Sequence, residues 1–169
     1  MISLAVRGRP APKGSHSAVA RGGRAWLIAG STATYRERLA AWTEAVADAA
    51  RQAASECGAI AGPVLLAVDF ALPRPASQPR VSLHVSRALG DIDKLVRATA
   101  DPLVAGGLLA DDSQICCLVA TRRLAGPGEP GGATITLARL DPLAAARSLA
   151  ETAAATILRA AGPTPLAAA

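Results

Sequence analysis

Alternation of apolar and polar positions predicts four strands. In the clearest of these runs Val64, Leu66, Val68 and Phe70 fall on one face, because side chains two residues apart in a strand point the same way. The four runs are residues 2–6, 63–70, 113–123 and 133–140, and a brief strand is also expected over residues 25–29. The expected fold is α+β, with the four runs forming a mixed sheet.

Apolar residues at helical spacing predict two helices packed on that sheet. Tyr35, Leu39, Trp42 and Val46 recur every three or four positions within residues 32–56, and Gly58 follows as a stop. A second helix is expected over residues 94–105, with Asp93 as its N-cap and Pro102 as a kink in its last turn.

Other stretches have the composition of loops or of a tail. Residues 7–24 are rich in Gly, Pro and Ser and carry five basic residues, so we expect a solvated loop or an arm that contacts phosphates rather than a packed element. Residues 73–90 predict a second loop, with room for a local strand over 81–85. From residue 141 the chain becomes Ala-rich and helix-prone. We therefore predict one domain over residues 1–140 and a C-terminal helical extension over 141–169.

Charge and cysteine usage narrow the class of protein. The 169-residue chain has a net charge of +5, which favours an anionic partner, most commonly nucleic acid. Its three cysteines have neither zinc spacing nor a disulfide framework, which is typical of a reducing cytoplasm. The sequence contains no apolar run of membrane-spanning length, so we expect a cytoplasmic protein without a membrane partner.

Acidic residues gather between Gly90 and Ile115, in a chain that is otherwise basic. This stretch holds five of the thirteen acidic residues, namely Asp91, Asp93, Asp101, Asp111 and Asp112. Ligands that are all oxygen atoms suit Mg²⁺ or Mn²⁺ rather than zinc. The other interpretation is that Asp91 and Asp93 are turn and cap residues and that Asp111 and Asp112 lie in a solvated loop. A shared site also requires the chain after the second helix to return towards Asp91.

The same region resembles the RusA family of Holliday junction resolvases. The resemblance rests on Asp91-Ile92-Asp93-Lys94-Leu95-Val96-Arg97, Asp101-Pro102-Leu103, Gly106-Gly107 and Asp111-Asp112-Ser113-Gln114-Ile115, with support from residues 8–15. It implies that Asp91, Asp93 and Asp112 are catalytic metal-binding carboxylates with Asp111 beside them. It also makes Arg97 the counterpart of a functionally important lysine. Lys94 stands where the family has asparagine, and Pro102 where it has alanine.

The resemblance further implies a homodimeric endodeoxyribonuclease of recombination and repair, of the kind found in bacteria, phages and prophages. Such an enzyme cuts four-way junctions by paired symmetric incisions, with Mg²⁺ as cofactor and Mn²⁺ as a substitute. The residues expected to contact DNA are Arg9, Lys13, Arg74, Arg80, Arg87 and Lys94. A catalytically weakened branched-DNA-binding protein of the same fold is the main alternative. A Mg²⁺-dependent nucleotide phosphohydrolase, which predicts a closed pocket, is a weaker one.

Overall fold

The computed structural model describes residues 1–14, 16–21, 24–29, 32–74 and 90–141, with backbone alone for 16–21 and 24–29. The chain divides into two compact units, Met1–Arg139 and Leu140–Ala169. Because the described residues end at 141 and omit 75–89, the predicted C-terminal extension beyond residue 141 and the predicted local strand over 81–85 lie outside them. The first unit contains all the helices and strands reported below.

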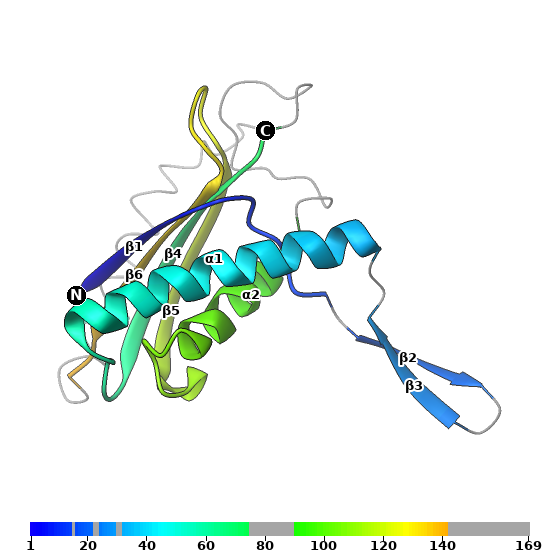
Figure 1. Ribbon diagram of the computed structural model, residues 1–169, viewed down its shortest axis with the longest axis horizontal. Helices are drawn as coiled ribbons and strands as arrows, with labels where there is room; N and C mark the ends of the chain where they lie inside the picture. Colours follow the sequence, from blue (N-terminus) through cyan, green and yellow to red (C-terminus); the bar gives the residue numbers. More distant parts are fainter. Residues whose placement is uncertain (15, 22–23, 30–31, 75–89, 142–169) are drawn as a thin grey trace, which may run out of the picture. The chain divides into compact units, whose positions relative to one another are not determined.

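A mixed four-stranded sheet with strand order β1-β6-β4-β5 forms the centre of the first unit (Figure 1). The strands are β1 (Ile2–Arg7), β4 (Val64–Leu72), β5 (Ile115–Leu124) and β6 (Gly132–Arg139). β6 is antiparallel to both β1 and β4, whereas β4 and β5 are parallel. This is the α+β fold and the set of four strands expected from the alternating pattern.

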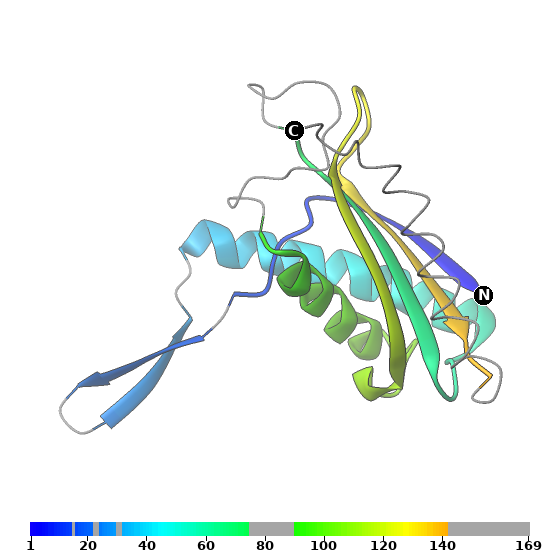
Figure 2. The same cartoon turned by 180° about the vertical axis from the view of Figure 1, so that it is seen from behind.

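Helices α1 (Ala33–Cys57) and α2 (Ile92–Ala105) cover one face of this sheet, and Figure 2 shows the sheet from the other side. The core between the layers includes Val64, Leu66, Val68 and Phe70 of β4, each at most 3% exposed. Trp42 of α1 packs on Phe70 with ring centroids 6.4 Å apart, and its indole N–H donates to the Thr99 hydroxyl of α2. These contacts join the two helices to the central strand, as the helical spacing predicted.

The prediction that residues 7–24 form no packed element is wrong in two respects. His16–Arg21 (β2) pairs antiparallel with Arg24–Ala29 (β3), so the brief strand expected at 25–29 is half of a hairpin. Gly22 and Gly23 between the two runs are the dipeptide signal for a two-residue hairpin, which the basic, Pro-rich composition obscured. In addition, Pro10 and Ala11 are buried, and Ala11 belongs to the hydrophobic core.

Helix α2 begins two residues earlier than predicted, which changes the role of Asp93. Asp91 is the N-cap residue but makes no side-chain cap hydrogen bond, and Asp93 lies in the first turn. The helix continues through Pro102 to Ala105. Asp93 is therefore not the cap, although a carboxylate in the first turn is still favoured by the helix dipole. Strand β5, by contrast, begins later than expected, because Asp112–Gln114 form the short 3₁₀ helix η2.

Candidate active site

The first acidic pair is exposed at the start of α2. Asp91 and Asp93 flank Ile92, the first helical residue. The Lys94 ammonium lies 2.8 Å from Asp91 Oδ2, one helical turn away. This contact raises the pKa of Lys94, chiefly through the hydrogen bond to Asp91 and then through its charge, and Asp93 adds a smaller effect. The first turn thus carries two carboxylates and one ammonium.

Contacts from distant parts of the sequence fix the chain just before this turn. The Gly90 carbonyl accepts a hydrogen bond from the Arg122 guanidinium of β5. Gly90 has φ +89, and a Cβ there would lie 2.5 Å from Pro12 Cγ, so both the backbone conformation and the space favour glycine. The Lys13 backbone N–H also donates to the Lys94 carbonyl at 3.0 Å. The N-terminal segment and the far end of β5 therefore position the Asp91 carboxylate.

The second acidic pair lies at the start of η2. Asp111 caps η2 by accepting from the Ser113 N–H at 2.9 Å, and hydrogen bonding from Ser113 lowers the pKa of Asp111. Gln114 completes a capping box and also donates to the carbonyls of Ile60 and Gly62, both at 2.9 Å. Asp112 is exposed in the first turn of η2. Asp111 therefore has a structural role in a turn that is tied to the segment before β4.

The two acidic pairs lie at opposite ends of α2 and of the neighbouring strand β5. Helix α2 has 14 residues and is about 21 Å long at 1.5 Å per residue. The first pair is beside Arg122, whereas the second directly precedes Ile115, and this part of β5 spans about 23 Å at 3.3 Å per residue. The chain after α2 does not return, because Leu108 and Leu109 are held beside Ile60. Among the described residues no three His, Cys, Asp or Glu side chains gather to hold a metal ion.

The predicted DNA-binding residues are in different environments. Lys13 forms an ion pair with Asp101 of α2, and Arg74 donates to the Ala125 carbonyl at 2.6 and 3.1 Å. Arg9 is exposed, and so is Arg97, which was predicted as a catalytic residue. Arg80 and Arg87 lie outside the described residues. Lys13 thus has a second role, in which it fastens the N-terminal segment to α2 through both its backbone and its side chain.

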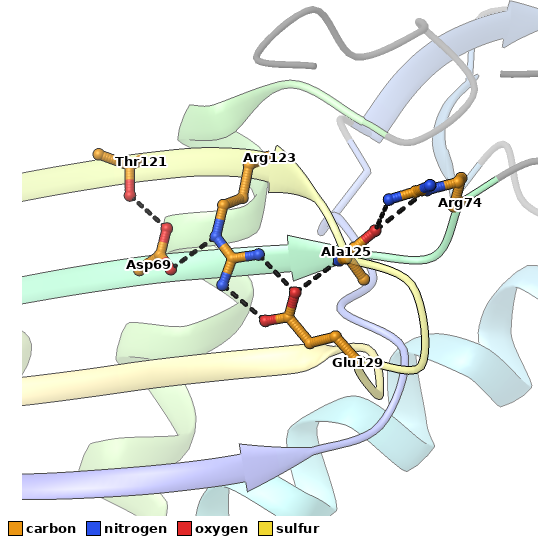
Figure 3. Close-up of polar contacts among 7 residues, drawn as sticks. Asp69, Arg74, Thr121, Arg123, Ala125 and Glu129 are labelled. Atoms are coloured by element: carbon orange, nitrogen blue, oxygen red, sulfur yellow. Dashed lines mark hydrogen bonds and ion pairs between the residues drawn. The ribbon is translucent and has the colours of Figure 1, made fainter. Parts of the chain in front are cut away.

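A further polar cluster, which the sequence did not indicate, joins the ends of β4 and β5 to the loop before β6 (Figure 3). Arg123 donates to both Glu129 oxygens, at 2.6 and 2.7 Å, and to Asp69 at 3.1 Å. Asp69 also accepts from the Thr121 hydroxyl at 2.6 Å. The guanidinium lowers the pKa of Glu129 to about 2, with help from the Gly126 N–H. These charges are paired with one another, so the cluster stabilises the loop.

The chain shares its sequence pattern with a known protein family. No curated protein sequence matches it significantly. No helix in the described parts of the chain is long and apolar enough to span a bilayer. A family model described as Endodeoxyribonuclease RusA matches residues 8–137, which include both acidic pairs and the whole of α2. The chain therefore belongs to the RusA family of endodeoxyribonucleases, which cut Holliday junctions.

Proposed function

We propose that this protein is a Mg²⁺-dependent endonuclease that resolves four-way DNA junctions as a homodimer, by paired symmetric incisions. The observation that carries the proposal is the family match across both acidic pairs. All four aspartates of these pairs are exposed to solvent. Exposure suits a substrate as large as a junction and counts against a phosphohydrolase with a closed pocket. We also propose that the enzyme acts in the cytoplasm, where it meets its DNA.

The donor chemistry of the proposed site fits the metal. Asp91, Asp93, Asp111 and Asp112 offer only oxygen ligands, which Mg²⁺ and Mn²⁺ prefer. When bound, Mg²⁺ supplies an activated water and neutralises the leaving oxygen. Asp111 is engaged in its capping box, so Asp112 is the better donor of the second pair.

Two copies of the chain would complete this site. Within one chain the pairs are about 20 Å apart, a separation set by the length of α2. A two-fold symmetric dimer forms two identical sites if each combines the first pair of one copy with the second pair of the other. Two such sites suit a four-way junction, since its approximate two-fold symmetry presents two equivalent strands.

Strand β5 is the surface that could bring the copies together. Among the described residues it is an edge strand of the sheet, and Leu118 and Val119 near its middle are 49% and 44% exposed. Antiparallel pairing of β5 with the β5 of a second copy, around a two-fold axis near Val119, places the Ile115 end of one strand beside the Arg122 end of the other. Because Arg122 holds Gly90, that arrangement brings the two acidic pairs together from different copies.

The basic residues have roles on the phosphate backbone. Arg97, exposed on α2 one turn after Asp93, can orient the scissile phosphate with its planar guanidinium and balance the phosphate charge. Arg9 and the predicted basic residues of the 73–90 loop would contact flanking phosphates, which position the junction without reading sequence. Binding should therefore weaken steeply with salt.

The test is cleavage of a labelled synthetic four-way junction, with linear duplex alongside, in Mg²⁺ and in EDTA. We expect paired nicks on opposed strands in Mg²⁺ alone. We expect Asp93→Asn to lower the cleavage rate at least a hundredfold and to leave junction binding in EDTA unchanged, because it removes a metal ligand and no phosphate contact. Loss of junction binding by a folded Asp93→Asn protein would contradict this division of roles.

The second candidate function is branched-DNA binding without turnover. It is favoured by the Lys94–Asp91 ion pair, which places an ammonium on a proposed metal ligand. It predicts tight, salt-sensitive junction binding with no nicks in either Mg²⁺ or Mn²⁺. The same cleavage assay therefore separates the two functions.

A further inference from the structure

Lys94 lies against the first acidic pair in a way that affects any cation bound there. Its ammonium is 2.8 Å from Asp91 Oδ2, and Lys94 and Asp91 keep 34% and 56% of their side-chain surface exposed. Asp93 lies within electrostatic range on the same turn. Lys94 thus already supplies positive charge to carboxylates that a divalent ion would use.

The ammonium and a divalent ion cannot both lie on Asp91 without conflict. Mg²⁺ binds carboxylate oxygen at about 2.0–2.1 Å, so an ion on Asp91 would lie within a few ångströms of the Lys94 ammonium. This separation is well below the screening length of about 8 Å in physiological salt, so dissolved ions screen the repulsion only weakly.

The attachment of Lys94 allows its ammonium to leave. The backbone is fixed, because the Lys94 residue is in α2 and its carbonyl accepts the Lys13 N–H at 3.0 Å. Beyond the backbone, the side chain is a flexible four-carbon stem with a strongly hydrated end. The ammonium can therefore swing into solvent or towards a phosphate while Asp91 stays in place.

We propose that Lys94 is a resident counter-ion of the acidic pair, which a divalent ion must displace, so that Lys94 sets the metal concentration at which the site fills. This proposal rests on the proposed function, because it assumes that Asp91 and Asp93 bind the metal. It assigns Lys94 a positioning role that acts through the metal ligands. Removing the ammonium eliminates both the competing ion pair and the repulsion, and together these predict about tenfold tighter metal binding.

The test is Mn²⁺ binding to the full-length protein without DNA, followed by the electron paramagnetic resonance signal of the free ion. We expect Lys94→Gln to lower the Mn²⁺ dissociation constant about tenfold, whereas Lys94→Arg, which keeps the charge, stays near the wild-type value. Since no DNA is present, a contact between Lys94 and phosphate cannot produce the shift.

Arg51→Gln is the matched control. Arg51 is exposed on α1 and pairs with Asp48 three residues earlier, just as Lys94 pairs with Asp91. Its substitution changes the net charge equally and should leave Mn²⁺ binding unchanged. An equal shift in both variants would reduce the effect to net charge and overturn the proposal.

Two further outcomes distinguish a failure of this proposal from a failure of the proposed function. If wild type and Lys94→Gln bind Mn²⁺ equally well, Lys94 is no competitor, and the metal-dependent function stands. If neither protein binds Mn²⁺ and neither cuts the junction, the proposed metal site fails and this inference fails with it. A melting curve for each variant establishes that the compared proteins are folded.

Discussion

At the scale of single residues, Arg123 shows how this chain uses charge away from its acidic pairs. Its guanidinium binds Glu129 through two hydrogen bonds and Asp69 through a third, and it lies between β5 and the loop that leads to β6. Its partner Asp69 is 54 residues away in the sequence. No local pattern of residues could reveal the whole cluster, because Asp69 reaches Thr121 and Arg123 only after β4 and β5 have paired.

We predict that Glu129→Gln destabilises the protein in a pH-dependent way. The folded pKa of Glu129 is about 2, below its ordinary value of 4.5, so its carboxylate stabilises the fold above pH 4.5. That contribution is lost as the pH falls from 4.5 towards 2. The difference in unfolding free energy between wild type and Glu129→Gln should therefore be constant near neutral pH and shrink across this range.

Urea titrations at several pH values measure that difference. Glu37→Gln, at an exposed position on α1, is the control and should leave the unfolding free energy within error at neutral pH. A Glu129→Gln protein as stable as wild type at pH 7 would show that the charge of Glu129 beside Arg123 contributes nothing to stability.

At the scale of elements, the C-cap of α2, Gly106, packs tightly against α1. A Cβ on Gly106 would lie 2.6 Å from both the Ala47 carbonyl oxygen and Ala50 Cβ of α1. We predict that Gly106→Ala costs about 1–3 kcal/mol because the helices must separate, and that Gly106→Ser costs more. The neighbouring Gly107 is the control. It has φ +75 and nothing within 4 Å, so Gly107→Ala and Gly107→Ser should cost similar amounts, about 1–2 kcal/mol of backbone strain.

Thermal and urea unfolding of the four variants check this contrast. The size of the side chain should matter at Gly106 and not at Gly107. Equal costs for alanine and serine at Gly106 would show that the helix contact can relax, and would contradict the close packing of the two helices.

Most elements could be predicted from the sequence because burial leaves a periodic pattern. The alternation in β4 and the spacing around Trp42 follow directly from one buried face. Strand β2 of the hairpin was missed because the small and basic residues of His16–Arg21 leave no such pattern. The sequence also indicated the four carboxylates of the candidate site. It could not indicate their separation, which depends on how α2 and the chain after it pack beside β4 and β5.

At the scale of the whole molecule, this separation makes the number of chains in the active site the central question. One chain presents an acidic pair at each end of α2, and β5 is an edge of the sheet in the part of the chain that the structure describes. A site built within one chain would require α2 or η2 to move by about 20 Å, against the packing of Leu103, Leu108 and Leu109 in the core. A site shared between two copies requires no such movement.

We predict that mixing two inactive variants restores cleavage. In a dimer of one Asp93→Asn chain and one Asp112→Asn chain, a shared arrangement leaves one site with both pairs intact, whereas an arrangement within each chain damages both sites. Equimolar mixing, with time for subunit exchange, should therefore recover single-strand nicking of the junction at a substantial fraction of the wild-type rate. The controls are each variant alone and the two variants assayed together before their subunits have exchanged. Native mass spectrometry establishes whether mixed dimers form. If they form and remain inactive, each site is built within one chain. The two acidic pairs would then have to come together within that chain, against the separation that α2 imposes here.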